Sequence, residues 1–264
     1  MNRPMTRAAA PGLPRLYALE AWTELLKTLR LSAFVVPTLS FPAIFYMLFG
    51  VVFRQGNGGK MAGAATYLLA TYGAFGVMGA ALFGFGASIA IERGQGWLEV
   101  KRASPMPLGA YFAAKLATSL AFGAMVVALL SLLAVTLGGV ELPLARWALL
   151  APTLLAGALP FGALGLVIGL TAGPNSAPPI VNLIYLPMGF FSGLWIPIRM
   201  LPSSVRWIAD GLPAFHLGEL ALAAVGLRPD EPIAGHVIFL LVFTLVCLAL
   251  AGWSWRRSEG KTYG

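Results

Sequence analysis

Long runs without a charged residue dominate the sequence, and short polar segments separate them. A soluble domain shows its apolar residues as periodic stripes, because only one face of each element is buried. Unbroken runs need an apolar solvent on every side, and about 20 residues suffice to cross the hydrocarbon layer of a bilayer. The charge-free runs cover residues 31–53, 61–91, 116–140, 147–198 and 237–255.

The fourth run, 147–198, is long enough for two membrane-spanning helices. Its centre, residues 172–179, is rich in Gly, Pro and Asn, which mark a break between helices. The pattern therefore predicts an all-α membrane protein with six transmembrane helices in a domain of residues 31–255. The expected spans are about 31–53, 63–91, 116–140, 147–172, 178–198 and 235–255.

The composition supports the same class. Of the 264 residues, 58% are hydrophobic and 11% are charged, whereas a soluble domain has about 25% charged residues. The formal net charge of +8 would suit a nucleic-acid-binding protein, but the basic residues are scattered at the ends of the runs and form no single basic face. We therefore expect a lipid bilayer, and no nucleic acid, around this chain.

Lys and Arg are unevenly distributed between the two sides of the predicted helices. Twelve of the 18 basic residues lie before the first run, between the second and third runs, or after the last run. The other six lie in the alternate segments, and the acidic residues divide evenly. Since cytoplasmic segments carry the excess of Lys and Arg, both termini are expected in the cytoplasm, with residues 256–264 as a cytoplasmic tail.

Residues 1–30 are expected to form a cytoplasmic arm followed by an amphipathic helix that opens at Pro14. Apolar residues recur there at spacings of three and four. Such a helix lies in the membrane interface, with Trp22 at the level of the headgroups. A short soluble helix packed on a partner is the alternative. The face opposite the apolar stripe carries Glu20, Glu24 and Lys27.

The segment 199–235 is too polar to span the membrane, yet it contains two short helical patterns. Residues 202–204, Pro-Ser-Ser, are typical of a helix start, and the second pattern runs over 214–225. The apolar content of both favours a re-entrant pair that dips into the outer leaflet, where protein or water must satisfy the backbone ends. A helical hairpin on the surface is the other interpretation.

The sequence does not support catalytic chemistry. The charge-free runs contain no Asp, Glu, Lys, Arg or His, so no proton relay is expected within them. Residues 260–262, Gly-Lys-Thr, end like a phosphate-binding loop, but Trp255 stands where that loop requires glycine. His216 and His236 are interpreted as structural, and Cys247 as a packing residue. We therefore expect a chain that is not an enzyme and has no metal or cofactor site of its own.

The segment between the second and third runs, from Glu92 to Pro107, is the longest charged stretch on the expected cytoplasmic side. Leu98, Val100 and their charged neighbours predict a short amphipathic helix. It would end near residues 104–105, Ser-Pro, because proline disfavours helix in the residue before it. From the residues alone, a solvated loop is the simpler interpretation.

In this segment the sequence resembles the membrane subunits of type 2 ATP-binding-cassette (ABC-2) exporters, which are permeases that work beside a separately encoded ATPase. Members carry Glu-Arg-Glu-x-Gly-Thr-Leu-Glu-x-Leu, followed by Ser-Pro, after the second span. The order of the spans, the interfacial helix and the outer helices is similar over nearly the whole chain. Gly94, Trp97 and Val100 depart from the motif. The matching residues are Glu92, Arg93, Gly96, Leu98, Glu99, Ser104 and Pro105.

The resemblance implies a cytoplasmic coupling helix around residues 98–104 that sits in a cleft of the ATPase. ATP and Mg would bind to that partner, of which two copies are expected, beside a second permease chain, identical or homologous. The complex would export an amphipathic, drug-like or lipid-like substrate across a bacterial inner membrane. The residues implied to contact the ATPase are Glu92, Arg93, Gly96, Trp97, Leu98, Glu99, Lys101, Arg102, Ser104 and Pro105.

The resemblance also implies that the first, second and fifth spans line the interface between the two permeases. Aromatic residues of these spans are candidates for the substrate path or that interface, although packing against lipid explains them equally well. An ATP-independent, ion-coupled transporter or channel is the alternative function, and the charge-free runs argue against it. The candidate aromatic residues are Phe34, Phe41, Phe45, Tyr46, Phe190 and Phe191.

Overall fold

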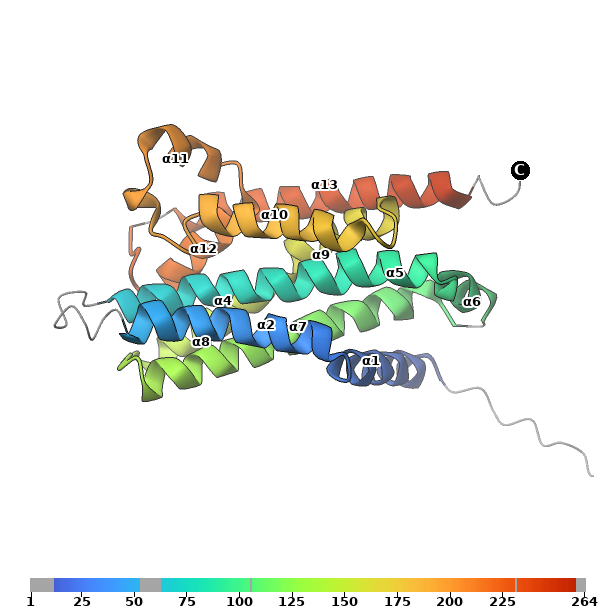
Figure 1. The fold of residues 1–264 in the computed structure, drawn as a ribbon, viewed down its shortest axis with the longest axis horizontal. Helices are drawn as coiled ribbons and strands as arrows, with labels where there is room; N and C mark the ends of the chain where they lie inside the picture. Colours follow the sequence, from blue (N-terminus) through green and yellow to red (C-terminus); the bar gives the residue numbers. More distant parts are fainter. Residues whose placement is uncertain (1–11, 53–62, 105, 231, 260–264) are drawn as a thin grey trace, which may run out of the picture.

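The computed structural model describes residues 12–52, 63–104, 106–230 and 232–259, and every regular element in this part of the chain is a helix. The long helices run side by side (Figure 1). One end of the bundle carries α1 and α6 and is called the α6 end; the other carries α11 and α12 and is called the α12 end. The elements are α1 (Leu13–Leu29), α2 (Ser32–Phe45), η1 (Tyr46–Val52), α4 (Ala64–Leu82), η2 (Phe83–Ala87), α5 (Ser88–Gly94), α6 (Trp97–Ala103), α7 (Leu108–Thr136), α8 (Leu144–Ala156), α9 (Ala158–Thr171), α10 (Ala177–Phe191), η3 (Ile198–Met200), α11 (Ser203–Ala209), α12 (Pro213–Ala224) and α13 (Ile233–Glu259).

In the described ranges, five helical segments are long and apolar enough to cross a membrane. Two of them combine an α-helix with a π-helical turn, as in α2–η1 and α4–η2–α5, and a third joins α8 to α9 at Gly157. The segments are Ser32–Val52, Ala64–Gly94, Leu108–Thr136, Leu144–Thr171 and Ile233–Arg257.

The count of six spans is not confirmed, because the helix at the fifth predicted span, 178–198, is short. α10 has 15 residues, which gives about 22 Å of helix against about 30 Å of hydrocarbon. It ends at Phe191, and Gly193 then adopts a left-handed conformation with a φ of 77°. Turns and bends follow up to Pro197. The apolar run is thus longer than its helix because the chain turns at glycine.

The helix at the third predicted span begins before the charge-free run. The prediction started at residue 116, after the last charged residue, whereas α7 covers Leu108–Thr136. Lys115 therefore lies inside this helix, and Glu92 lies in α5, within the long segment that starts with α4. Both residues lie just outside the charge-free runs, and each finds an oppositely charged partner inside the protein.

The segment that starts with α4 forms the centre of the bundle. In its most apolar stretch, 78% of the residues are buried. The corresponding shares in α2–η1 and α13 are 22% and 17%. The helices α2, α7, α9, α10 and α12 all pack against α4. The outer faces of α2 and α13 expose apolar side chains, as expected for helices in contact with lipid.

α9 packs closely against the π-helical turn η2 through glycines. A Cβ atom on Gly165 would lie 3.0 Å from the backbone nitrogen of Gly86, and one on Gly169 would lie 2.8 Å from the carbonyl oxygen of Phe85. Small residues let helix backbones approach in this way. The spacing of the two glycines in the sequence is therefore explained by a helix contact.

Two short helices cover the α12 end. α11 starts at Ser203 and α12 covers Pro213–Ala224, close to the predicted patterns, and Gly226 closes α12 with a φ of 85°. Most residues of α12 are buried against α4, α8 and α13. α11 instead leaves Trp207 71% exposed. α12 therefore enters the bundle, whereas α11 stays outside it.

Replacing Gly169 by leucine is expected to destabilise the protein by about 1–3 kcal/mol, the usual cost of forcing a larger side chain into a packed contact. Thermal unfolding of the purified protein in lipid nanodiscs measures the change. Gly252→Leu is the matched control, because nothing lies within 4 Å of a Cβ atom at that position of α13. Equal melting temperatures for the two variants would contradict the close contact between α9 and η2.

Candidate functional site

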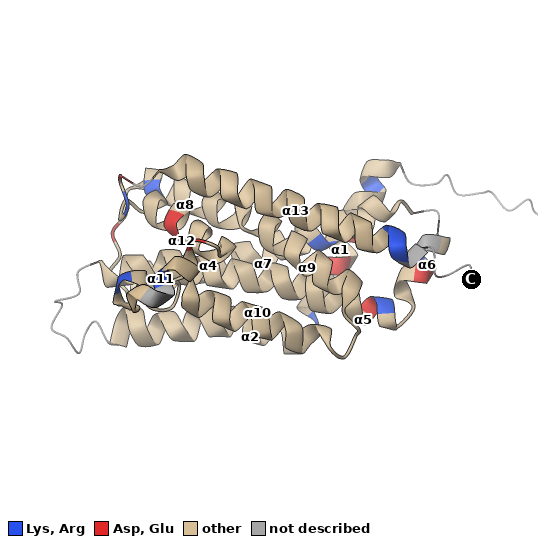
Figure 2. Ribbon diagram, turned by 90° about the horizontal axis from the view of Figure 1, so that it is seen from above, with Lys and Arg blue, Asp and Glu red and all other residues tan. Residues whose placement is uncertain are grey.

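Charged residues lie mainly toward the two ends of the bundle (Figure 2). At the α6 end, the helices α1, α5, α6 and α7 meet, and α1 packs along α7. This end contains most of the residues that the sequence singled out, together with several that it did not.

Lys115 of α7 lies at the centre of a buried charge cluster. Its side chain is 2% exposed and donates hydrogen bonds to Glu24 of α1 at 2.6 Å, to Glu92 of α5 at 2.7 Å, and to the Ser88 hydroxyl. Glu24 is itself only 5% exposed. Since a buried ammonium group needs partners that replace its lost hydration, Lys115 holds three helices together.

Lys27 and Tyr111 complete this charge cluster, which comprises Glu24, Lys27, Glu92, Tyr111 and Lys115. Lys27 forms ion pairs with Glu24 at 2.7 Å and with Glu92, and the Tyr111 hydroxyl donates a hydrogen bond of 2.6 Å to Glu92. Burial acts to lower the pKa of Lys27, but the hydrogen bonds and charges of the two carboxylates outweigh it and raise that pKa. Two carboxylates therefore face two ammonium groups, and the cluster is electrically balanced.

α6 is attached to the bundle by polar contacts of Lys101 and an apolar contact of Leu98. Lys101 forms an ion pair with Glu20 of α1, and its ammonium lies 5.0 Å from the ring centre of Tyr111. Leu98 is 5% exposed and belongs to a small apolar cluster that also contains Leu170 of α9. α6 is therefore held against α1, α7 and α9.

The local sequence defines both ends of α6, which lies where a helix was predicted over 98–104. Gly96 precedes it with a φ of 77°, a conformation that glycine adopts readily. At the other end, the Ser104 hydroxyl donates a hydrogen bond of 2.7 Å to the Lys101 carbonyl. Pro105 and the side chain of Arg102 lie outside the described part of the structure.

The opposite face of α6 points away from the protein. Trp97 is 54% exposed and Val100 is 60% exposed, and Glu99 is exposed beside them. Single exposed apolar residues are common, but an apolar pair beside a carboxylate on a short fixed helix is suited to contact with another protein.

Arg93 and Gly94 connect α5 to the segment between α9 and α10. The Arg93 guanidinium donates hydrogen bonds to the carbonyls of Leu170 and Ala172, the latter at 2.7 Å. A Cβ atom on Gly94 would lie 2.5 Å from Pro174. The departure from the ABC-2 motif at Gly94 thus has a steric reason, since a glutamate does not fit there.

Sequence reasoning found Glu92 and Lys101 but missed their partners. Lys27 and Lys115 bind Glu92, and Glu20 binds Lys101. The available signal was the charged face of the amphipathic helix before the first span. In the structure this face points into the protein, whereas Leu19 and Trp22 on the apolar side of α1 are 49% and 58% exposed. A helix in the interface would place its apolar side in lipid, and its charged side then has to find partners in the protein.

A cavity of about 510 Å³ lies beside the charge cluster, between α1, α2, α5, α6 and α7. Its walls combine the charged residues of the cluster with apolar ones such as Phe34 and Phe122. Within the described part of the chain, the buried hydroxyls of Thr118 and Ser119 in this wall have no hydrogen-bond partner. The cavity is therefore amphipathic.

The six candidate aromatic residues do not form one surface. Phe34 lies in this cavity and packs edge-on against Phe122, with 5.0 Å between the ring centres. Phe41 and Phe45 stack at 6.0 Å. Tyr46 is fully buried in the core. Phe190 and Phe191 are partly buried at the end of α10, with their ring centres 5.4 Å apart.

At the α12 end, the two histidines form a pair, which the sequence did not indicate. Nδ1 of His216 lies 2.7 Å from Nδ1 of His236, and Nε2 of His216 lies 2.9 Å from the Asp210 carbonyl. Since a carbonyl only accepts, Nε2 of His216 carries the proton and its Nδ1 accepts from His236. Burial lowers the pKa of His216. The pair joins α12 to α13 and supports a structural role.

Comparison with known proteins identifies the class of this chain. The sequence model of the ABC-2 type transporter family matches residues 16–226. Because the match covers most of the sequence, the chain belongs to the ABC-2 type transporter family. It is therefore a multi-pass membrane protein, and its class is that of a transport permease rather than an enzyme. The resemblance predicted from the sequence is thereby confirmed. The family implies a partnership with an ABC ATPase.

A curated relative supports the same class. The chain is 28% identical over 236 residues to "Putative transport permease YvfS" of Bacillus subtilis (strain 168), and the alignment covers 89% of this chain and 95% of the relative. The similarity therefore extends across both the α6 end and the α12 end.

Replacing Lys115 by methionine is expected to destabilise the protein by about 3–5 kcal/mol, because it leaves two carboxylates without their buried partner. Glu24→Gln in the same chain should restore part of the loss, since it removes one of the unpaired charges. Thermal unfolding in nanodiscs measures both effects. Lys101→Met is the matched control with a smaller expected effect, because Lys101 is 21% exposed. A Lys115→Met variant as stable as the parent would contradict the role of the charge cluster.

Proposed function

We propose that this chain is the permease subunit of an ATP-driven exporter and that α6 is its coupling helix. The observation that carries the proposal is the two-sided structure of α6. One side is fixed to the bundle through Lys101, which contacts Glu20 and Tyr111, and through the buried Leu98. The other side exposes Trp97, Glu99 and Val100. A partner that moves α6 therefore also moves α1, α5 and α7.

In this proposal the α6 end faces the cytoplasm, both termini lie there, and the protein resides in a bacterial inner membrane. The excess of Lys and Arg in the segments at that end supports the orientation. ATP and Mg bind to two copies of a separate ATPase. When the ATPases close, the coupling helices are displaced and the bundle changes from an inward-open to an outward-open state, a rigid-body transition.

The substrate is proposed to be amphipathic, either drug-like or lipid-like. The cavity beside the charge cluster supports this class, because its wall offers buried hydroxyls next to aromatic rings. A ligand with one polar and one apolar end would satisfy both kinds of surface.

A second permease chain is proposed to pack on α2 and α10. These helices lie on one side of the bundle, and α13 lies toward the other (Figure 2). Phe41 of α2 and Leu183 of α10 are 53% and 74% exposed. Phe45 stacks on Trp195 with 5.6 Å between the ring centres, which connects α2 to the segment after α10. α10 is also too short to span alone, so a neighbour on this side would cover its ends.

An ion-coupled transporter is the alternative, and the carboxylate of Glu92 within a long helical segment is the observation in its favour. Against it, Glu92 already has Lys27, Lys115 and Tyr111 as partners. Transport assays separate the two mechanisms. The proposed exporter stops when ATP is depleted and continues when ion gradients are collapsed, and the opposite result would identify the ion-coupled mechanism.

Replacing Trp97 by aspartate is expected to reduce the amount of ATPase recovered with the permease by about tenfold, because a charge would be placed in an apolar part of the interface. Glu99→Arg should have a similar effect by inverting a charge. Pull-down from native membranes followed by mass spectrometry measures the recovery. Trp207→Asp, which changes an exposed tryptophan at the opposite end, is the control and should leave it unchanged. Full recovery with both α6 variants would exclude α6 as the docking site.

A cysteine at position 183 is expected to form a disulfide-linked or chemically cross-linked permease dimer in membranes, provided that Cys247 is first replaced by serine. Leu245→Cys on α13 is the control, because Leu245 is 66% exposed on a helix outside the proposed interface. Gel electrophoresis under non-reducing conditions measures the dimer. Cross-linking through residue 245 instead of 183 would place the interface on α13.

A further inference from the structure

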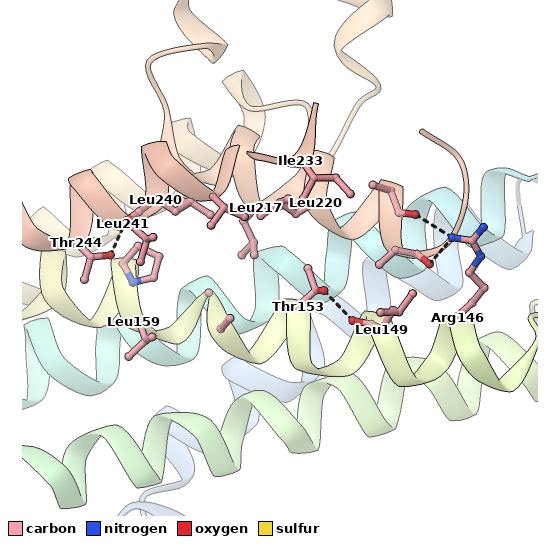
Figure 3. Close-up of a pocket in the computed structure, with 16 residues that line it drawn as sticks. Arg146, Leu149, Thr153, Leu159, Leu217, Leu220, Ile233, Leu240, Leu241 and Thr244 are labelled. Carbon is pink, nitrogen blue, oxygen red and sulfur yellow. Dashed lines mark hydrogen bonds between the residues drawn. The ribbon is translucent and has the colours of Figure 1, made fainter. Parts of the chain in front are cut away.

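A second cavity, separate from the site at the α6 end, lies near the α12 end between α8, α9, α12 and α13 (Figure 3). Its volume is about 460 Å³. Leu217 of α12 is 1% exposed and forms part of its floor, whereas Leu149 of α8 and Leu241 of α13 are 52% and 57% exposed at its walls. The cavity is therefore a groove on the outer surface of the bundle, where it is open to lipid.

The walls of the groove offer almost no polar group to a ligand. The Thr153 hydroxyl donates a hydrogen bond of 2.7 Å to the Leu149 carbonyl, and the Thr244 hydroxyl donates one of 2.6 Å to the Leu240 carbonyl. Both hydroxyls are thus satisfied within their own helices (Figure 3). A hydrocarbon chain matches such walls.

One end of the groove carries a positive charge. Arg146 is half-buried there, and its Nη1 donates two long hydrogen bonds, of 3.3 and 3.4 Å, to the carbonyls of Ala223 and Ala224 at the end of α12 (Figure 3). In the described residues no carboxylate forms an ion pair with Arg146. Gly226 packs against the guanidinium, since a Cβ atom there would lie 3.2 Å from it. The charge is therefore held in place, and no carboxylate of the described ranges neutralises it.

The length of the groove matches one leaflet. From Ile233 to Thr244 its α13 wall rises about 16 Å along the helix, and half of the hydrocarbon layer is about 15 Å. Arg146 lies at the end of the groove near the α12 end, where the headgroups of that leaflet would be. An arginine binds the oxygens of a phosphate through its planar set of donors.

We propose that this groove binds a phospholipid, with one acyl chain between α9, α12 and α13 and the phosphate on the Arg146 guanidinium. A negatively charged lipid such as phosphatidylglycerol binds best, because it brings no ammonium group of its own to oppose Arg146. The lipid would connect α12 to α8 and α13. This site is distinct from the amphipathic cavity proposed for the transported substrate and does not depend on that proposal.

Native mass spectrometry of the purified protein with added phosphatidylglycerol tests this site, and diacylglycerol with the same acyl chains serves as the probe without phosphate. The parent protein should bind phosphatidylglycerol about tenfold more tightly than diacylglycerol, as expected for one charge-assisted contact. In Arg146→Gln the two lipids should bind equally weakly. In Leu241→Trp, which fills the groove, neither should bind.

Arg206→Gln is the matched control, because Arg206 lies at the same end and also donates to backbone carbonyls, at Arg199 and Leu201, but outside the groove. It should retain the parent preference. Circular dichroism confirms that each variant is folded. If Arg146→Gln keeps the tenfold preference, or if Leu241→Trp still binds phosphatidylglycerol, the proposed site is wrong.

Discussion

The ammonium group of Lys115 is the constraint on which the α6 end depends. It is almost completely removed from water inside a helix bundle, and leaving one such ion uncompensated costs several kcal/mol, a large part of the about 5–15 kcal/mol that stabilise a typical domain. Glu24 and Glu92 provide the compensation, and each comes from a different helix. The position of α1 against α7 follows from this requirement, and α6 then rests on the surface that these helices form.

The two ends of the bundle are stabilised by different interactions. At the α6 end, charged residues of four helices neutralise one another. These ion pairs fix the orientation of the helices as well as the separation between them. At the α12 end, the largely apolar helix α12 fills the bundle, and its buried Glu219 pairs with Arg228 at 2.8 Å. An apolar helix surface tolerates sliding more easily than a set of directed ion pairs. In the proposed transport cycle, the α6 end would therefore move as one body while the α12 end adjusts.

The sequence predicted the class of fold and much of the candidate site, because both rest on local patterns. Charge-free runs located the five long helical segments of the described ranges. Leu98, Val100 and the Ser-Pro pair at 104–105 predicted α6 within one residue at each end. The failures came from contacts between distant segments. Lys115 was assigned to a loop, because its partners are 91 and 23 residues away and the local sequence does not reveal them. Gly193 ends α10 early through a left-handed backbone conformation, which a hydropathy pattern does not indicate. The groove at Arg146 likewise joins helices that are separate in sequence.

The π-helical turn at Phe83–Ala87 gives the α6 end a defined rotational setting relative to the rest of the bundle. A π turn contains about one residue more than an α-helical turn, and each residue rotates a helix by about 100°. Without that extra residue, the carboxylate of Glu92 would point away from Lys115 while α4 kept its place in the core. The number of residues in this turn therefore aligns the charged end with the apolar body.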